Sequence, residues 1–114
     1  MNHESRLTPE GRTEPLRVLW TGRSGQRYVL TTVQPDGFAL REGQLYVLSN
    51  HGTIRWAGIS EDLITDHASR ARFRAALGEG ASILTLPAPG DDLARMTLVW
   101  DLEGTSASAD RNAA

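Results

Sequence analysis

Short runs of aliphatic, aromatic and β-branched residues fill the first half of the chain. They lie at 16–20, 27–33, 44–49 and 53–57, and their composition is typical of β-strands. Glycine-containing turns at 21–26 and 50–52 separate the first run from the second and the third from the fourth. The pattern therefore predicts two antiparallel hairpins, joined by a turn at 34–37 and a short extended piece at 38–40.

The apolar positions change to helical spacing from Ser60 onward. Ser60 is a favourable N-cap residue, acidic residues follow it in the first turn, and Leu63 begins an apolar stripe. Ser69 is a second favourable cap residue further along. We predict either one helix over 60–77 or two short helices with a bend near His67.

The last third of the chain predicts one more strand and one more helix. Residues 81–86 are mostly aliphatic, and the prolines at 87 and 89 end that run. Residues 91–103 fit both an amphipathic helix with an aspartate cap and an alternating strand, and we predict a helix at 92–102. The whole pattern predicts one α/β domain of the α+β kind at 16–103, with an N-terminal hairpin, a small mixed or antiparallel sheet and two or three helices.

The apolar positions of these elements predict the core. Trp20, Trp56 and Trp100 are expected to anchor it because each tryptophan can bury a large apolar area. An exposed tryptophan would instead mark an interface. The other expected core residues are Leu19, Tyr28, Leu30, Leu45, Val47, Ile54, Leu63, Ile64, Ile83, Leu86 and Met96.

Composition narrows the range of functions. The 114-residue chain suits one domain and has no cysteine, which excludes disulfides, thiolate zinc ligands and a cysteine nucleophile. Its basic residues are all arginine, as expected of a GC-rich bacterial genome. The net charge of −2 argues against a protein whose whole surface binds phosphate groups. Residues 1–15 and 104–114 are small and polar and are predicted to be disordered tails. Because no signal peptide or membrane-spanning run is evident, we expect a cytoplasmic protein with no membrane association.

Four short motifs, in this order, resemble those of the GIY-YIG nuclease superfamily. Gln-Leu-Tyr at 44–46 stands where the family has Gly-Ile/Val-Tyr on a strand, and Trp-Ala-Gly at 56–58 stands where it has Tyr-Ile/Val-Gly. Asp-Leu at 62–63 opens the next helix, and Asp-Leu at 101–102 resembles the last helix of bacterial relatives. The resemblance covers about residues 17–103 and implies a nuclease-like scaffold whose last helix carries a metal-binding glutamate.

The sequence departs from this family at three of the four groups that carry its chemistry. In the family, two tyrosines and an arginine position and polarise the scissile phosphate, and the glutamate holds a divalent cation. Only Tyr46 is retained here. Trp56 replaces the second tyrosine, Asp66 falls at the arginine position and Val99 falls at the glutamate position. Because such groups act as a unit, the resemblance implies a degenerate, non-catalytic version.

Other residues of chemical interest have simpler explanations. His51 and His67 are too few for a metal cluster, so no metal site and no cofactor are expected. The turn at 22–25 superficially suggests a phosphate cradle. It lacks the Gly-Lys-Ser/Thr ending and a following helix, so we interpret it as a hairpin turn.

Two functions remain open on the sequence. The first is a non-catalytic binding or interaction module on a GIY-YIG-like scaffold, with either a weakly held nucleic acid or a protein as partner. Three arginines near the helix end either complement the helix macrodipole or contact that partner. The alternative is a metal-dependent endonuclease with displaced active-site residues, which uses the retained Tyr46, a displaced arginine such as Arg70, and Glu103 as the metal ligand. The candidate binding residues of the first function are Tyr46, Trp56, Gly58, Arg70, Arg72 and Arg74. The sequence does not indicate the oligomeric state.

Overall fold

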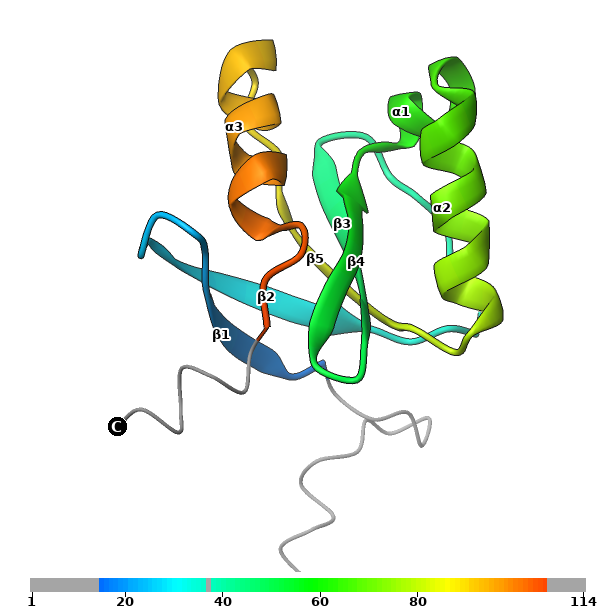
Figure 1. The fold of residues 1–114 in the computed structure, drawn as a ribbon, viewed down its shortest axis with the longest axis horizontal. Coiled ribbons are helices and arrows are strands. Elements are labelled where there is room, and N and C mark those ends of the chain that lie inside the picture. The colour runs from blue at the N-terminus through cyan, green and yellow to red at the C-terminus, as the bar shows by residue number, and fades with distance from the viewer. Residues whose placement is uncertain (1–14, 37, 107–114) are drawn as a thin grey trace, which may run out of the picture.

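The computed structural model describes residues 15–36 and 38–106, which form five strands and three helices (Figure 1). Their bounds are β1 Arg17–Thr21, β2 Arg27–Val33, β3 Gln44–Asn50, β4 Thr53–Gly58, α1 Ser60–Thr65, α2 His67–Gly78, β5 Ser82–Pro87 and α3 Asp92–Leu102. This order confirms the predicted α+β class and the helical state of the last segment. Most of the two predicted tails, and Gly37 of the predicted turn, lie outside the described residues.

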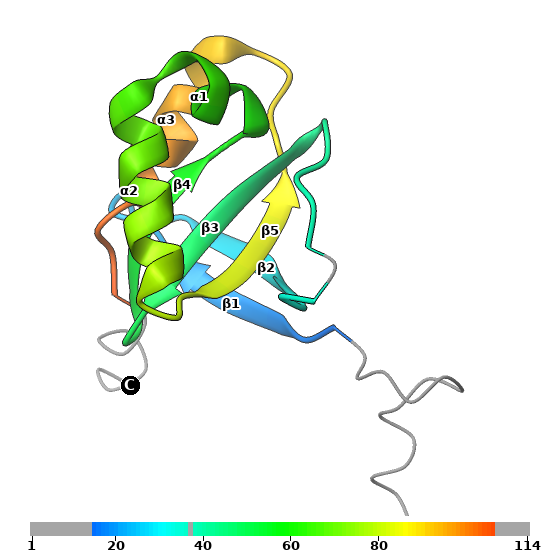
Figure 2. The ribbon, with the colours of Figure 1, turned by 90° about the vertical axis from the view of Figure 1, so that its right-hand side faces the viewer.

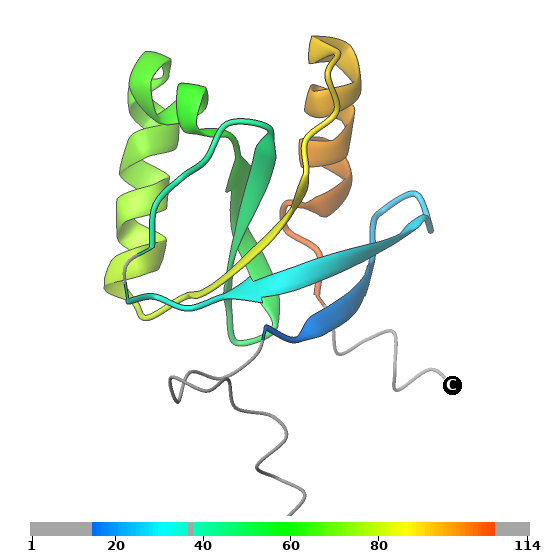
Figure 3. The same cartoon turned by 180° about the vertical axis from the view of Figure 1, so that it is seen from behind.

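The five strands form one curled antiparallel sheet in the order β1-β2-β5-β3-β4. Both predicted hairpins, β1–β2 and β3–β4, are present. β5 pairs with β2 on one side and with β3 on the other, as Figure 3 shows from behind. Because an isolated two-stranded hairpin is marginal in water, β5 makes the two hairpins mutually dependent.

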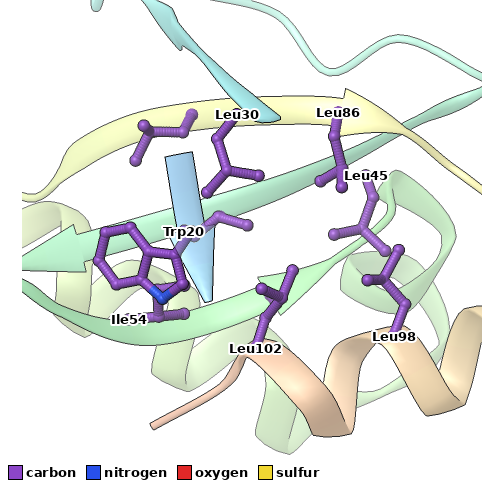
Figure 4. Packing of buried hydrophobic residues seen from close by; sticks show 10 residues of the cluster. Trp20, Leu30, Leu45, Ile54, Leu86, Leu98 and Leu102 are labelled. Carbon is purple, nitrogen blue, oxygen red and sulfur yellow. The ribbon is translucent and has the colours of Figure 1, made fainter. Parts of the chain in front are cut away.

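The helices cover opposite faces of this sheet. On one face, Leu98 and Leu102 of α3 pack with Leu30 and Leu45 of the sheet (Figure 4). On the other face, α2 packs across β3 and β4 (Figure 2). Successive side chains of a strand point to opposite faces, so β3 supplies side chains to both layers and is the most buried strand.

A break at Asp66 divides the segment predicted as one helix or two. Asp66 has φ −118° and ψ 105°, and its carboxylate accepts hydrogen bonds from the amides of Ala68 and Ser69 as the N-cap of α2. The prediction that Ser69 caps this helix is therefore wrong, because Ser69 lies inside its first turn. Ile59, and not Ser60, occupies the N-cap position of α1.

Eight of the predicted core residues are buried, and Tyr28 and Leu63 are half-buried. The buried eight are Trp20, Leu30, Leu45, Val47, Ile54, Trp56, Ile83 and Leu86. Four predictions are wrong: Leu19 is 57% exposed, Ile64 75%, Met96 60% and Trp100 59%.

Three of these errors, at Leu19, Met96 and Trp100, have a local geometric cause. In β1, Val18 and Trp20 face the layer under α3, so Leu19 between them points the other way. In α3, the buried side is defined by Leu98 and Leu102, which places the Met96 and Trp100 stripe on the opposite side of the helix. The sequence pattern identified these elements correctly and assigned the wrong face to them. No helix of the described part of the chain is long and apolar enough to cross a membrane.

Candidate functional site

Tyr46 lies in the middle of the sheet and its hydroxyl group is held by backbone. The side chain is buried, and the hydroxyl oxygen accepts a hydrogen bond of 2.9 Å from the Arg41 amide and lies 3.4 Å from the Ala39 carbonyl oxygen. The ring of Phe38 packs edge-on against it, with 5.6 Å between the ring centroids. Tyr46 therefore fastens the 38–41 segment onto the sheet.

A hollow of about 620 Å³ opens beside Tyr46. Its floor is a row of three paired residues, Thr31 of β2, Thr85 of β5 and Tyr46 of β3. Its walls come mainly from the segment between β2 and β3, with Arg41 and Glu42 at the rim among the lining residues. Volumes of this size are typical of small-ligand sites. The hollow is thus the best-formed concavity that includes a predicted site residue.

Trp56 and Gly58 are packing residues of β4. The Trp56 ring is fully buried, its Nε1–H donates a 2.8 Å hydrogen bond to Ser69 Oγ, and Phe73 packs edge-on against it at 4.9 Å. At Gly58, a Cβ would lie 2.8 Å from the Trp56 ring and 2.7 Å from the Asp62 carboxylate. That carboxylate in turn accepts a hydrogen bond from the amide of Ile59 at 2.9 Å. The position therefore requires glycine because of close approach, and neither Trp56 nor Gly58 lines the hollow.

Glu103, the residue after α3, lies at the outer edge of β4. Its Oε2 accepts a 3.0 Å hydrogen bond from the amide of Ala57 and a 3.1 Å hydrogen bond from Arg72 Nη1 of α2. The next residues continue along the same edge, where Gly104 and Thr105 exchange backbone hydrogen bonds with Ile54. Glu103 therefore helps to cover an edge strand that would otherwise expose unpaired amides.

The structure does not bring Tyr46 and Glu103 together. The Tyr46 hydroxyl contacts the 39–41 segment and its side chain lines a hollow over β2, β5 and β3. The Glu103 carboxylate binds the edge of β4 that faces away from β3. The paired strands β3 and β4 thus separate the two groups of the endonuclease hypothesis.

The three arginines of α2 do not share one side of the helix. Arg70 donates a 3.0 Å hydrogen bond to the Leu63 carbonyl at the end of α1 and lies 3.1 Å from Nδ1 of His67. Arg72 pairs with Glu103, and Arg74 is exposed. Residues two apart on a helix are rotated by about 200° around the helix axis. Arg72 therefore lies on the opposite side of α2 from Arg70 and Arg74. The predicted basic group is therefore not one continuous patch.

The positions that depart from the nuclease pattern also serve the fold. Asp66 caps α2, and Val99 packs against the core cluster under α3. A second ion pair, between Arg95 Nη1 of α3 and Asp62 Oδ1 of α1 at 3.6 Å, ties the helices together on either side of β4. These side chains hold helices in place.

Asp101 is the polar residue that sequence reasoning missed. It is buried in α3, where Oδ1 accepts from the Ser24 amide at 2.6 Å and Oδ2 accepts from the hydroxyls of Ser24 at 2.8 Å and Tyr28 at 2.6 Å. Gly22 lies so close to this carboxylate that any Cβ would overlap it. The β1–β2 turn that superficially suggests a phosphate cradle thus binds an anion, and the anion is the protein's own Asp101.

Burial and hydrogen bonding in this cluster shift two pKa values in opposite directions. Burial alone raises the pKa of Asp101, but the hydrogen bonds from Tyr28 and Ser24 outweigh it and leave the pKa below its usual value. The pKa of Tyr28 is raised to about 12 by burial, by its hydrogen bond to Asp101 and by the negative charge of Asp101. Two signals in the sequence could have indicated the cluster: an aspartate between Leu98 and Leu102 on the apolar side of α3, and a serine in a glycine-rich turn.

Among the described residues, no group of three or more histidine, aspartate and glutamate side chains is placed to hold a metal ion. Comparison of the chain with protein-family models, with curated protein sequences and with solved structures finds no match.

Proposed function

We propose that this protein is a non-catalytic binding module on a GIY-YIG-like scaffold. The observation that carries the proposal is that polar side chains of the candidate site form hydrogen bonds with other groups of the protein. Tyr46 binds the Arg41 amide, Glu103 binds the Ala57 amide and Arg72, and Arg70 binds the Leu63 carbonyl. A phosphodiester would need such groups turned toward one reacting centre.

The hollow beside Tyr46 supports the binding half of the proposal. Threonine side chains from two strands lie on its floor, and Arg41, Glu42 and Gln44 are among the polar residues that line it. Thr85 Oγ1 lies 2.9 Å from Gln44 Oε1, so one part of the lining is fixed by its own hydrogen bonds. The partner is a small polar molecule or an extended segment of another protein. A bacterial origin, which the all-arginine basic composition favours, belongs to the same proposal, as does a cytoplasmic location.

A nuclease assay tests the proposal. The wild-type protein is expected to leave single- and double-stranded DNA and RNA intact with magnesium or manganese present, because the Tyr46 hydroxyl and the Glu103 carboxylate are bound to different parts of the fold. Tyr46→Phe and Glu103→Gln are assayed beside it, so that cleavage by a trace contaminant is recognised by its indifference to both changes. Metal-dependent cleavage that both substitutions abolish would overturn the proposal in favour of the endonuclease.

A further inference from the structure

The outer side of α3 carries a stripe of exposed apolar side chains. Leu93 is 71% exposed, and with Met96 and Trp100 it forms a series at positions i, i+3 and i+7. This spacing places the three side chains on one line along the helix, directly opposite Leu98 and Leu102. Leu93, Met96 and Trp100 are called the α3 stripe below. Such spacing is typical of a helix that packs against another helix.

The charges at the two ends of the stripe are opposite. At the N-terminal end, Asp92 follows the cap residue Asp91, and its side chain is 91% exposed and pairs with Arg95 at 3.3 Å. Arg95 also pairs with Asp62, so the acidic groups at this end outnumber the basic one. At the C-terminal end, the guanidinium group of Arg23 lies 5.7 Å from the centre of the Trp100 ring. Arg23 is held there by hydrogen bonds to the carbonyl oxygens of Trp100 and Glu103. The stripe is therefore acidic at its start, apolar in its middle and basic at its end.

This order of charges along the α3 stripe is self-complementary when two copies of the helix run antiparallel. If two copies of α3 pack antiparallel with the two-fold axis between Met96 and Thr97, each Leu93 meets the other copy's Trp100. The same alignment places each Asp92 near the other copy's Arg23, and it opposes the two helix macrodipoles. A parallel alignment would instead place Asp92 beside Asp92 and Arg23 beside Arg23, which like-charge repulsion disfavours.

The ends of the chain do not supply a matching surface. Residues 1–14 contain only Met1 and Leu7 as large apolar residues, and residues 107–114 contain none. Neither segment has the three apolar side chains at helical spacing that would cover the α3 stripe.

We propose that the α3 stripe is a self-association surface that binds the α3 stripe of a second copy of this chain in an antiparallel, two-fold symmetric pair. The proposal does not depend on whether the domain binds a ligand at the Tyr46 hollow, which lies on the other face of the sheet. An 11-residue helix is about 16 Å long, so the contact is small and the pair dissociates on dilution.

Sedimentation analysis of the full chain over a wide range of concentrations tests this proposal. The wild type is expected to pass from monomer to dimer as concentration rises. Met96→Asp places a charge at the centre of the contact in both copies and should weaken the association at least about tenfold. Ile64→Asp is the matched control, because Ile64 is as exposed as the stripe residues but lies on α1, and it should leave the association unchanged.

The absence of cysteine from the chain allows a test of the orientation. Under oxidising conditions Met96→Cys should form a covalent dimer readily, because the two-fold axis brings the two residues 96 close together. Leu93→Cys should do so slowly, since antiparallel packing sets the two residues 93 about two helical turns apart. A wild type that stays monomeric, a dimer that ignores Met96→Asp, or faster cross-linking at 93 than at 96 would each overturn the proposal. The first result would assign the stripe to a helix of a different protein.

Discussion

Asp101→Ala is expected to lower the free energy of unfolding by about 2–4 kcal/mol, since it removes the charged acceptor of three hydrogen bonds. The Ser24 amide and the Tyr28 hydroxyl lose their partner, and the β1–β2 turn loses its side-chain attachment to Asp101, keeping only the hydrogen bonds of Arg23 to the backbone of α3 and Glu103. Urea unfolding of the purified protein measures the effect. Asp92→Ala in the same helix is the matched control and should cost less than about 1 kcal/mol, because that side chain is almost fully exposed. Equal costs for the two substitutions would contradict the role assigned to Asp101.

The same cluster predicts how stability depends on pH. The pKa of Asp101 is lower in the folded state, so its contribution is present above the unfolded pKa of about 3.9 and is lost as pH falls below it. The pKa of Tyr28 is raised to about 12, so its contribution is present below the unfolded pKa of about 10 and is lost as pH rises toward 12. Asp101→Asn should flatten the acid side of the profile, and Tyr28→Phe should flatten the alkaline side. Unchanged profiles in both variants would show that other groups control the pH dependence.

Leu102→Ala is expected to cost about 2–5 kcal/mol, because Leu102 is fully buried between α3 and the sheet and the truncation leaves a cavity there. Leu93→Ala removes the same atoms from the same helix on its exposed side and should change stability by no more than about 0.5 kcal/mol. Urea unfolding at low protein concentration compares the two variants. A larger effect at Leu93 than at Leu102 would show that α3 packs with its other side.

The element order follows from local patterns that the sequence shows directly. The glycine turns, the change of spacing at Ser60 and the prolines after Leu86 mark boundaries that local physics determines. The side of each element that faces the sheet is not marked by local patterns in the same way. In α3, for example, apolar residues lie on two sides of the helix. Leu98 and Leu102 differ from Met96 and Trp100 only in which side the sheet covers, and that depends on how β1, β2 and β5 meet. A local pattern does not contain this information.

The candidate site was predictable to a similar extent. Tyr46 is predicted as a site residue from its motif, and its side chain lines the hollow of about 620 Å³. The partners of Glu103 were not predictable, because Arg72 and Ala57 are distant in sequence and meet it only at the edge of β4. The Asp101 cluster was missed for the same reason, since Ser24 and Asp101 are 77 residues apart.

The central claim is that the polar side chains of the candidate site stabilise the fold instead of performing chemistry. Residues selected for catalysis commonly reduce stability, so their removal leaves stability unchanged or increases it. A side chain that covers a strand edge behaves in the opposite way.

The most direct measurement is the free energy of unfolding of Glu103→Ala, compared with that of Glu79→Ala. Both glutamates follow the last residue of a helix, and Glu79 is exposed. We expect Glu103→Ala to lose about 1–2 kcal/mol, because the Ala57 amide and Arg72 lose their acceptor, and Glu79→Ala to stay close to the wild type. A Glu103→Ala protein that is as stable as the wild type, or more stable, would contradict the claim.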